Sequence, residues 1–163
     1  FDAYREAADG YGYKASPYQM GHLLPIYVAE SDSRAEEEAK QHILWLYHYG
    51  LRHKWEMFFP PGYTSSASMK RIMARAADFD WENMDFKELN ERGYCIVGSS
   101  RTVRERLSAL VKDLGFGLLL PLLHTGDMPH HRVVKNMDLF ATEVMPALRR
   151  EFSYMSDHES AAA

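Results

Sequence analysis

The sequence predicts an α/β fold in which parallel strands alternate with helices. Residues 22–29 are mostly apolar without a polar–apolar alternation, as in a strand covered on both faces, and a capped helical pattern over 34–50 follows them. A second unit combines an amphipathic helix over 100–114 with the wholly apolar run 118–123 and a final helix over about 129–150. These two strand–helix units are the basis of the predicted fold class.

The first unit follows a helix over residues 1–9, which has no capping residue before it, so we expect a segment to precede the chain. Ser33 and Glu36 have capping-box spacing and predict the start of the next helix at Arg34. The apolar residues of that helix share one face, which we expect to be buried: Ala35, Ala39, Ile43, Leu46 and Tyr47.

Residues 51–94 lack this regular pattern. The run 58–62 predicts a turn, 65–79 predict one helix, and 78–92 alternate acidic side chains with aromatic ones. We identify no third buried strand here. A long irregular insertion between regular units is typical of an active-site lid. We therefore expect an inserted, mobile, lid-like region.

In the second unit, Ser100 is the predicted N-cap, and Gly115 the predicted end, of a helix with one apolar stripe. The run 118–123 then predicts a buried strand. The final helix should present five apolar residues to a core, Val133, Met137, Phe140, Val144 and Leu148. We expect residues 153–163 to form a flexible tail.

Two parallel strands cannot bury both of their own faces, which indicates that this chain forms part of a larger sheet. An α/β barrel requires eight strands and about 250 residues, whereas this chain has 163. We therefore predict that residues 1–152 form the C-terminal portion of a (β/α)8 TIM barrel whose beginning is missing.

Composition excludes several classes of protein. The chain is 46% apolar and 13% aromatic, which is enough for a packed core. Its formal net charge of −4 gives no reason to expect nucleic acid or a membrane surface as a partner. Cys95 is the only cysteine, so an internal disulfide is impossible and a cytoplasmic location is the simplest expectation. The longest apolar run is far shorter than the roughly 20 residues of a membrane span.

The loop after the last predicted strand contains the main candidate site residues, because the active sites of α/β barrels lie at the C-terminal ends of the strands. These candidates are His124, Gly126, Asp127 and Met128, and Glu30 has the equivalent position after the first strand. His124 could assist proton transfer. The alternatives are that Asp127 only caps the final helix, and that His124 and Glu30 are solvated strand ends.

Other constellations give weaker hypotheses. The histidines at positions 42, 48 and 53 do not have the spacing that places two imidazoles on one helix face, so we expect no metal site. Gly98-Ser-Ser100 resembles half of a nucleophile elbow, but Thr102 stands where the second glycine is required. A hydrolase that uses Ser100 is therefore the least favoured hypothesis.

Several short sequence motifs, spread over nearly the whole chain, resemble the C-terminal half of the bacterial luciferase-like, flavin-dependent monooxygenases. The most specific are Ile26-Tyr-Val-Ala-Glu30 before an acidic helix, the Gly98-Ser helix start, Gly126-Asp-Met-Pro-His130, and Val144-Met-Pro-Ala-Leu148. One departure is Ser100-Arg101, where members of the family usually have a proline in the first helical turn.

The resemblance implies a barrel that binds reduced FMN or, in some branches, F420, and that uses O2 to oxygenate a small organic substrate. It implies that the first unit supplies strand seven, that 51–94 corresponds to the active-site loop, and that 118–123 is strand eight. A flavin reductase would supply the reduced flavin, and the protein would be a homodimer or be completed by a missing N-terminal half. The alternative is a non-catalytic flavin-binding or assembly protein derived from the same fold.

Overall fold

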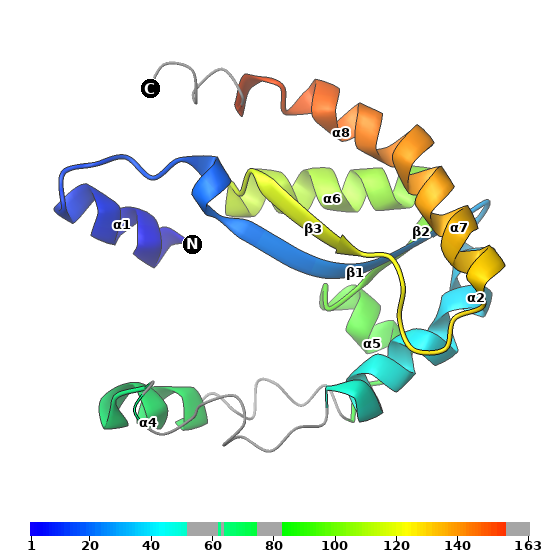
Figure 1. Cartoon of the computed structure of the whole chain (residues 1–163), viewed down its shortest axis with the longest axis horizontal. Helices are drawn as coiled ribbons and strands as arrows, with labels where there is room; N and C mark the ends of the chain where they lie inside the picture. The colour runs from blue at the N-terminus through cyan, green and yellow to red at the C-terminus, as the bar shows by residue number, and fades with distance from the viewer. Residues whose placement is uncertain (52–61, 63, 75–82, 156–163) are drawn as a thin grey trace.

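The structure is a computed structural model that describes residues 1–51, 62, 64–74 and 83–155. Its centre is a parallel sheet with the strand order β2-β1-β3, where β1 is Gly21–Ala29, β2 is Ile96–Ser99 and β3 is Leu118–Leu122 (Figure 1). The predicted α/β class is confirmed.

The strand β1 lies in the middle of this sheet and pairs with each neighbour through a different half. Its residues 26–29 pair with β2, and its residues 21–25 pair with β3. The expectation of only two strands is therefore wrong, because the four residues of β2 are too few to produce a recognisable apolar run. The strand order also differs from that of successive barrel strands, which would place β2 between β1 and β3.

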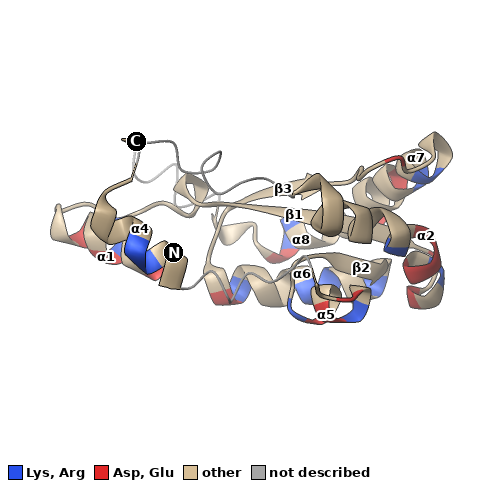
Figure 2. Cartoon of the chain, turned by 90° about the horizontal axis from the view of Figure 1, so that it is seen from below, with Lys and Arg blue, Asp and Glu red and all other residues tan. Residues whose placement is uncertain are grey.

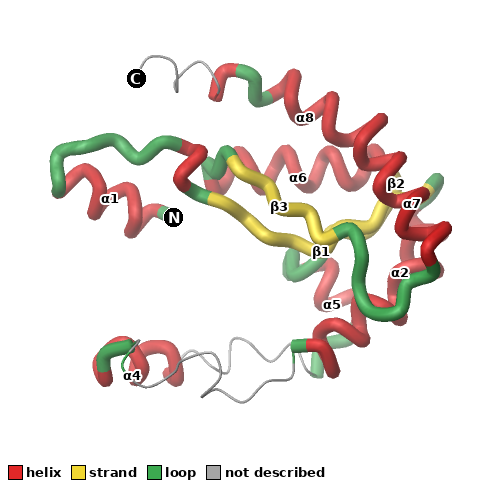
Figure 3. Tube along the Cα trace, in the orientation of Figure 1, coloured by secondary structure: helices red, strands yellow, loops and turns green. Residues whose placement is uncertain are grey.

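Helices connect the strands and extend to both ends of the chain. Figure 3 shows that α7 (His130–Leu139), a π-helical turn over Phe140–Val144 and α8 (Met145–Glu151) form one continuous helical segment. A second π-helical turn, Leu46–Gly50, extends α2, and a short 3-10 turn, Pro17–Gln19, precedes β1. The α-helices of the described residues are α1 Asp2–Gly10, α2 Asp32–Trp45, α4 Ser66–Ala74, α5 Phe86–Glu91, α6 Ser100–Leu114, α7 His130–Leu139 and α8 Met145–Glu151.

Two helices begin slightly earlier than their sequence patterns predict. The Ser31 hydroxyl accepts from the backbone N–H of Arg34 at 3.2 Å and caps α2, so the predicted capping box of Ser33 and Glu36 is wrong. The Ser99 hydroxyl caps α6 in the same way, in place of Ser100. Two serines lie close together at the start of each helix, Ser31 and Ser33 at α2 and Ser99 and Ser100 at α6. The sequence alone therefore does not identify which serine of each pair is the cap.

The sheet is covered on both faces, as the apolar run of β1 predicts. Figure 1 shows α6 and α8 on one side and α2 and α5 on the other. Alternate residues of β1 supply the two cores, since Leu24, Ile26 and Val28 pack with α6 and the helical segment around Val144, whereas Tyr27 and Ala29 pack with α2 and α5. A closed barrel, by contrast, has helices only on its outer side.

Part of the region predicted to be an insertion belongs to this core. Met84, Phe86 and Leu89 are all buried, because α5 packs beside α2. The helix predicted over 65–79 is observed as α4, Ser66–Ala74. Residues 52–61, 63 and 75–82 lie outside the described residues, and with them nearly all of the predicted turn and the first part, 78–82, of the acidic and aromatic stretch. The lid-like role of 51–94 stays a prediction.

The strand β3 is not buried, contrary to prediction. Leu118 is 47% exposed and Leu120 is 44% exposed, and Leu23 of β1 beside them is 66% exposed. The cause is that β3 pairs on one side only, and no helix of the described part of the chain covers this end of the leucine face. Met137 of α7, which we expected in the core, is also 46% exposed.

The two ends of the described chain pack near the C-terminal end of α6. The rings of Phe1 and Phe116 lie 6.4 Å apart, and Met155 is buried in the same cluster as Phe116. Residues 156–163, most of the predicted tail, lie outside the described residues.

Figure 2 shows the charged residues on the helices, while β1 and β3 carry none. None of the described helices combines the length and the apolar character that crossing a membrane requires.

Candidate functional site at the carboxyl ends of the strands

The carboxyl ends of all three strands lie at one edge of the sheet, because the strands are parallel. Glu30 follows β1, Ser99 is the last residue of β2, and the loop that begins at Leu123 follows β3 at this edge. The helices α2, α6 and α7 begin at the same edge, because each of them follows one of these strand ends. The site is therefore built from strand ends and from residues of the helices α2 and α7.

The side chain of Asn136 connects these strand ends from α7. Its Oδ1 accepts from the backbone N–H of Val28 at 2.8 Å, and its Nδ2 donates to the carbonyls of Ile26 and Leu123, each at 2.9 Å. The residue is completely buried. One amide thus fixes the end of β1, the end of β3 and α7 relative to each other.

A buried carboxylate, Glu38 of α2, is the centre of a charged cluster beside Asn136. It accepts from the Tyr27 hydroxyl at 2.9 Å and from Lys135 at 2.5 Å, and it pairs with Arg34 at 2.7 Å. Lys135 also contacts Glu30 at 3.3 Å. The cluster connects β1, α2 and α7 through charge-assisted hydrogen bonds.

The pKa values in this cluster follow from its geometry. Burial opposes the ionisation of Glu38, but the hydrogen bonds from Lys135 and Tyr27 outweigh it and lower the pKa of the carboxyl. The pKa of Glu30 is also lowered, chiefly by a backbone hydrogen bond and then by Lys135. Burial and the bond to Glu38 raise the pKa of the Tyr27 hydroxyl. The cluster therefore holds two ionised carboxylates and a neutral phenol at neutral pH.

The loop after β3 is attached to α2 by a histidine–aspartate pair. His42 is buried, and its Nδ1 lies 2.9 Å from Oδ1 of the exposed Asp127. An ionised carboxylate only accepts, so Nδ1 carries the proton, and Nε2 then accepts from the Gln41 amide at 3.1 Å. The alternative that Asp127 caps the final helix is wrong, because Pro129 is the N-cap and no side chain caps this end.

Gly126 and Met128 also serve to place this loop. Gly126 has a φ of +58°, and a Cβ atom there would lie 3.1 Å from the Trp45 ring, so both backbone conformation and space favour glycine. Met128 is buried in the core beside α2. The described side-chain contacts of Met128 are therefore structural.

Thr125 is the most unusual residue of the loop. It is only 5% exposed, and its Oγ1 has no hydrogen-bond partner among the described residues. Buried hydroxyls are nearly always hydrogen-bonded, so an orphaned one needs an explanation. A bound polar group, or a part of the protein that the structure does not describe, would supply the partner.

The end of β2 has a polar arrangement of its own. The Asp32 carboxylate accepts from the backbone N–H of Ser99 at 2.6 Å and from the Thr102 hydroxyl at 3.1 Å. These bonds lower the pKa of Asp32. A Cβ atom at Gly98 would lie 2.9 Å from Asp32 Oδ1, so glycine is needed for this close approach.

The sequence-predicted residues fall into three groups. Gly126, Asp127 and Met128 meet α2, and Glu30 meets α7 through Lys135. His124 is exposed, and no hydrogen bond within the described residues joins it to the other candidates. The predicted catalytic role of His124 stays a prediction. The described residues contain no group of three side chains suited to a metal ion.

Sequence reasoning missed the polar residues at the centre of the site. Glu38 and His42 directly precede the buried Ala39 and Ile43 of α2. Asn136 lies three residues after Val133 and four before Phe140, on the same helical face as these two buried residues. The sequence did contain a signal for these residues, which is a polar side chain within an apolar helical stripe. A buried polar side chain requires a hydrogen-bond partner, so such a position indicates a polar contact inside the protein.

No protein-family model matches the sequence, and no curated protein matches it. Among solved structures, the chain is similar to the oxygenating constituent of 3,6-diketocamphane monooxygenase from the CAM plasmid of Pseudomonas putida, a type II Baeyer–Villiger monooxygenase in complex with FMN. The TM-score is 0.61 at 22% identity, over 89% of this chain and 38% of that one.

A second solved structure, the monooxygenase RslO1 from Streptomyces bottropensis, matches with a TM-score of 0.58 at 21% identity, over 90% of this chain and 36% of that one. Both likenesses show a common fold. The chain spans less than two fifths of the length of either neighbour.

Proposed function

We propose that this chain is the C-terminal part of a luciferase-like, FMN-dependent monooxygenase, which uses reduced flavin and O2 to oxygenate a small organic substrate. The observation that carries the proposal is the similarity of nine tenths of the chain to a monooxygenase solved with FMN. The resemblance of Gly126-Asp-Met-Pro-His130 and other short motifs to the luciferase-like monooxygenases supports the same function independently.

The residues at the carboxyl edge fit one side of a flavin or substrate site. The orphaned hydroxyl of Thr125 can donate a hydrogen bond to a bound polar atom, and Asn136 and the His42–Asp127 pair hold its loop in place. The cations Lys135 and Arg34 are already neutralised by carboxylates, so we expect the flavin phosphate to bind elsewhere in the whole protein. Bound FMN, rather than the protein, would supply the redox chemistry.

His124 is the candidate proton donor or acceptor of this site. It directly follows Leu123, whose carbonyl Asn136 holds, so its backbone position is fixed although its side chain is exposed. A neutral imidazole has one ring nitrogen that donates and one that accepts a proton, so it can transfer a proton within the reaction. Glu30, at the end of the neighbouring strand, would orient the substrate or flavin through Lys135.

The test measures FMN binding by quenching of flavin fluorescence, with this chain and with a form extended by any in-frame sequence that precedes Phe1. O2 consumption is then followed with NADH, a flavin reductase and a panel of cyclic ketones and aldehydes. We expect FMN to bind and a substrate to stimulate O2 uptake. If neither form binds FMN or consumes reduced flavin, the proposal is wrong.

Matched threonine variants test the site itself. Thr125→Val removes the orphaned hydroxyl and should weaken FMN or substrate binding about tenfold, the equivalent of roughly one hydrogen bond. The same variant should not destabilise the unliganded chain, because the hydroxyl has no described partner to lose. Thr142→Val, on the exposed surface of the last helical segment, is the control. It removes only an exposed bond from the Thr142 hydroxyl to the Asp138 carbonyl at 2.7 Å, so it should leave ligand binding unchanged and change stability by less than about 0.5 kcal/mol.

A non-catalytic flavin-binding or assembly role is the second candidate function. It is favoured by the exposed leucines of β1 and β3, Leu23, Leu118 and Leu120, which form an apolar surface beside an open strand edge. FMN binding without substrate-dependent O2 consumption, in a form that carries any preceding segment, would select this role.

A further inference from the structure

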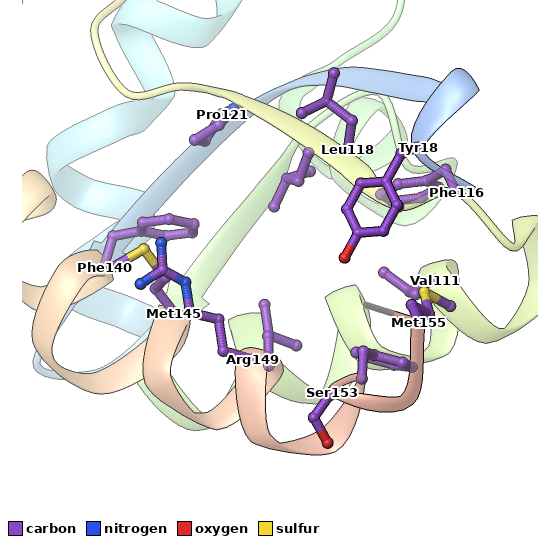
Figure 4. Close-up of a pocket in the computed structure, with 14 residues that line it drawn as sticks. Tyr18, Val111, Phe116, Leu118, Pro121, Phe140, Met145, Arg149, Ser153 and Met155 are labelled. Carbon is purple, nitrogen blue, oxygen red and sulfur yellow. The ribbon is translucent and has the colours of Figure 1, made fainter. Parts of the chain in front are cut away.

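The structure contains a pocket on the α6 and α8 face of the sheet, and its lining shares no residue with the candidate site. It lies between the N-terminal end of β3, the C-terminal end of α6 and the helix α8 (Figure 4), and its volume is about 570 Å³. This volume is within the range of roughly 300–1,000 Å³ that is usual for small-molecule sites. None of the sequence-predicted site residues lines it.

The lining of this pocket is apolar and rich in aromatic rings. Phe116 and Tyr18 lie at one end of it, and Phe140 and Met145 lie at the other, as Figure 4 shows. Aromatic rings of this kind favour a ligand that is itself apolar and flat, because ring pairs gain energy beyond the area that they bury.

Among the described residues, one cation lines the pocket. Arg149 of α8 extends toward the end where Phe140 and Met145 lie (Figure 4), and its guanidinium has no ion-pair partner among the described residues. Glu151, the acidic residue of the same helix, is occupied by Lys112 at 2.6 Å and by Ser108 at 2.6 Å. Arg149 is therefore free to bind an anion, and a guanidinium binds a carboxylate through two parallel hydrogen bonds.

We propose that this pocket binds an aryl-alkyl carboxylate, with the ring among the aromatic side chains and the carboxylate on Arg149. The chain as a whole has a net charge of −4, so a general attraction of anions does not explain such binding. The site lies on the α6 and α8 side of the sheet and shares no lining residue with the candidate site at the carboxyl edge. It is a second site, and it is independent of the proposed flavin chemistry.

The experiment uses the 163-residue chain, isothermal titration calorimetry and 4-phenylbutyrate as the probe. Its uncharged analogue, 4-phenylbutanol, should bind about tenfold more weakly, because it loses the charge-assisted bonds to Arg149. In a series from phenylacetate to 6-phenylhexanoate, each added methylene should raise the affinity about fourfold until the pocket is full.

Two neighbouring arginines supply the variant and its control. Arg149→Gln should abolish the preference for the acid over the alcohol and leave 4-phenylbutanol binding unchanged. Arg150→Gln removes a charge that is also exposed but does not line the pocket, and it should change neither affinity. Equal effects of the two variants, or the absence of binding by any member of the series, would overturn the proposal.

Methionine methyl NMR signals locate the ligand. Met145 and Met155 line the pocket, whereas Met137 is exposed and outside it. We expect 4-phenylbutyrate to shift the first two signals and not the third. Shifts of Met145 and Met155 that depend on protein concentration alone would show that a second copy of the chain covers the pocket, and would also overturn the proposal.

Discussion

The Asn136 amide gives the sharpest test of how the candidate site is held together. Asn136→Leu keeps a similar side-chain volume but removes hydrogen bonds to the backbone of Val28, Ile26 and Leu123. Three hydrogen bonds at about 1 kcal/mol each give an expected loss of about 3 kcal/mol in the free energy of unfolding. That is a large part of the roughly 5–15 kcal/mol of a typical domain.

Urea unfolding monitored by circular dichroism measures this loss. With a slope of about 2 kcal/mol/M, the midpoint should fall by roughly 1.5 M. Met137→Leu, at the exposed neighbouring position, is the control and should change stability by less than about 0.5 kcal/mol. A loss below about 1 kcal/mol in Asn136→Leu would refute the role that we assign to the amide.

Asn136→Asp adds a pH dependence with a defined sign. The new carboxylate would face the carbonyls of Ile26 and Leu123, which accept and cannot donate, so its pKa in the folded state should be raised. A raised carboxyl pKa favours the protonated folded form. The variant should therefore be closest to wild type at acidic pH and lose stability as the pH rises through the folded-state pKa. A pH-independent difference from wild type would contradict this reasoning.

Three further predictions concern other features of the fold. Glu38 has a lowered pKa, so wild type should lose stability as the pH falls below the ordinary value of 4.5, whereas Glu38→Gln should cost about 2 kcal/mol at pH 7 and show a flatter pH profile in urea unfolding. Gly126→Ala should cost about 1–2 kcal/mol in thermal unfolding, because φ is +58° and the added Cβ meets Trp45, whereas Gly10→Ala, where a Cβ has free space, should not destabilise. Burial raises the pKa of the Cys95 thiol to about 12, so it should react with Ellman's reagent only on unfolding.

Each of these predictions has a clear contrary result. An unchanged pH profile in Glu38→Gln would mean that another carboxyl governs acid unfolding. Equal costs for Gly126→Ala and Gly10→Ala would show that the loop does not require a left-handed residue. Rapid labelling of Cys95 at neutral pH in the folded protein would contradict its burial.

Most of the helices and the two longer strands were predictable because each has a strong local signal, whereas the short helix α5 lies in the region that we interpreted as an irregular insertion. The stripe of α6 repeats over four turns and ends at Gly115, whose φ of +63° is the left-handed conformation that a helix-terminating glycine supplies. The apolar run of β1 lacks alternation, and both of its faces are covered. In these elements local sequence and tertiary packing agree.

The parts that sequence could not predict depend on distant partners. β2 is recognisable only through its pairing with β1, and the exposure of Leu118 and Leu120 depends on what lies beside β3. The buried Glu38 and Asn136 are explained by Tyr27, Lys135 and strand-end backbone groups far away in the chain. Likewise, Asp127 resembles a helix cap in sequence, but its partner is His42 of another helix.

The central position of β1 has a consequence for how the sheet forms. Its C-terminal half can pair with β2 after one crossover through α2 and α5, whereas its N-terminal half must wait for β3, which is made after α6. Closing the longer loop costs more chain entropy, so the β1–β3 half should assemble last and open first. The end of the sheet that carries the exposed leucines is then also its least protected end, where backbone amide hydrogens exchange with solvent soonest.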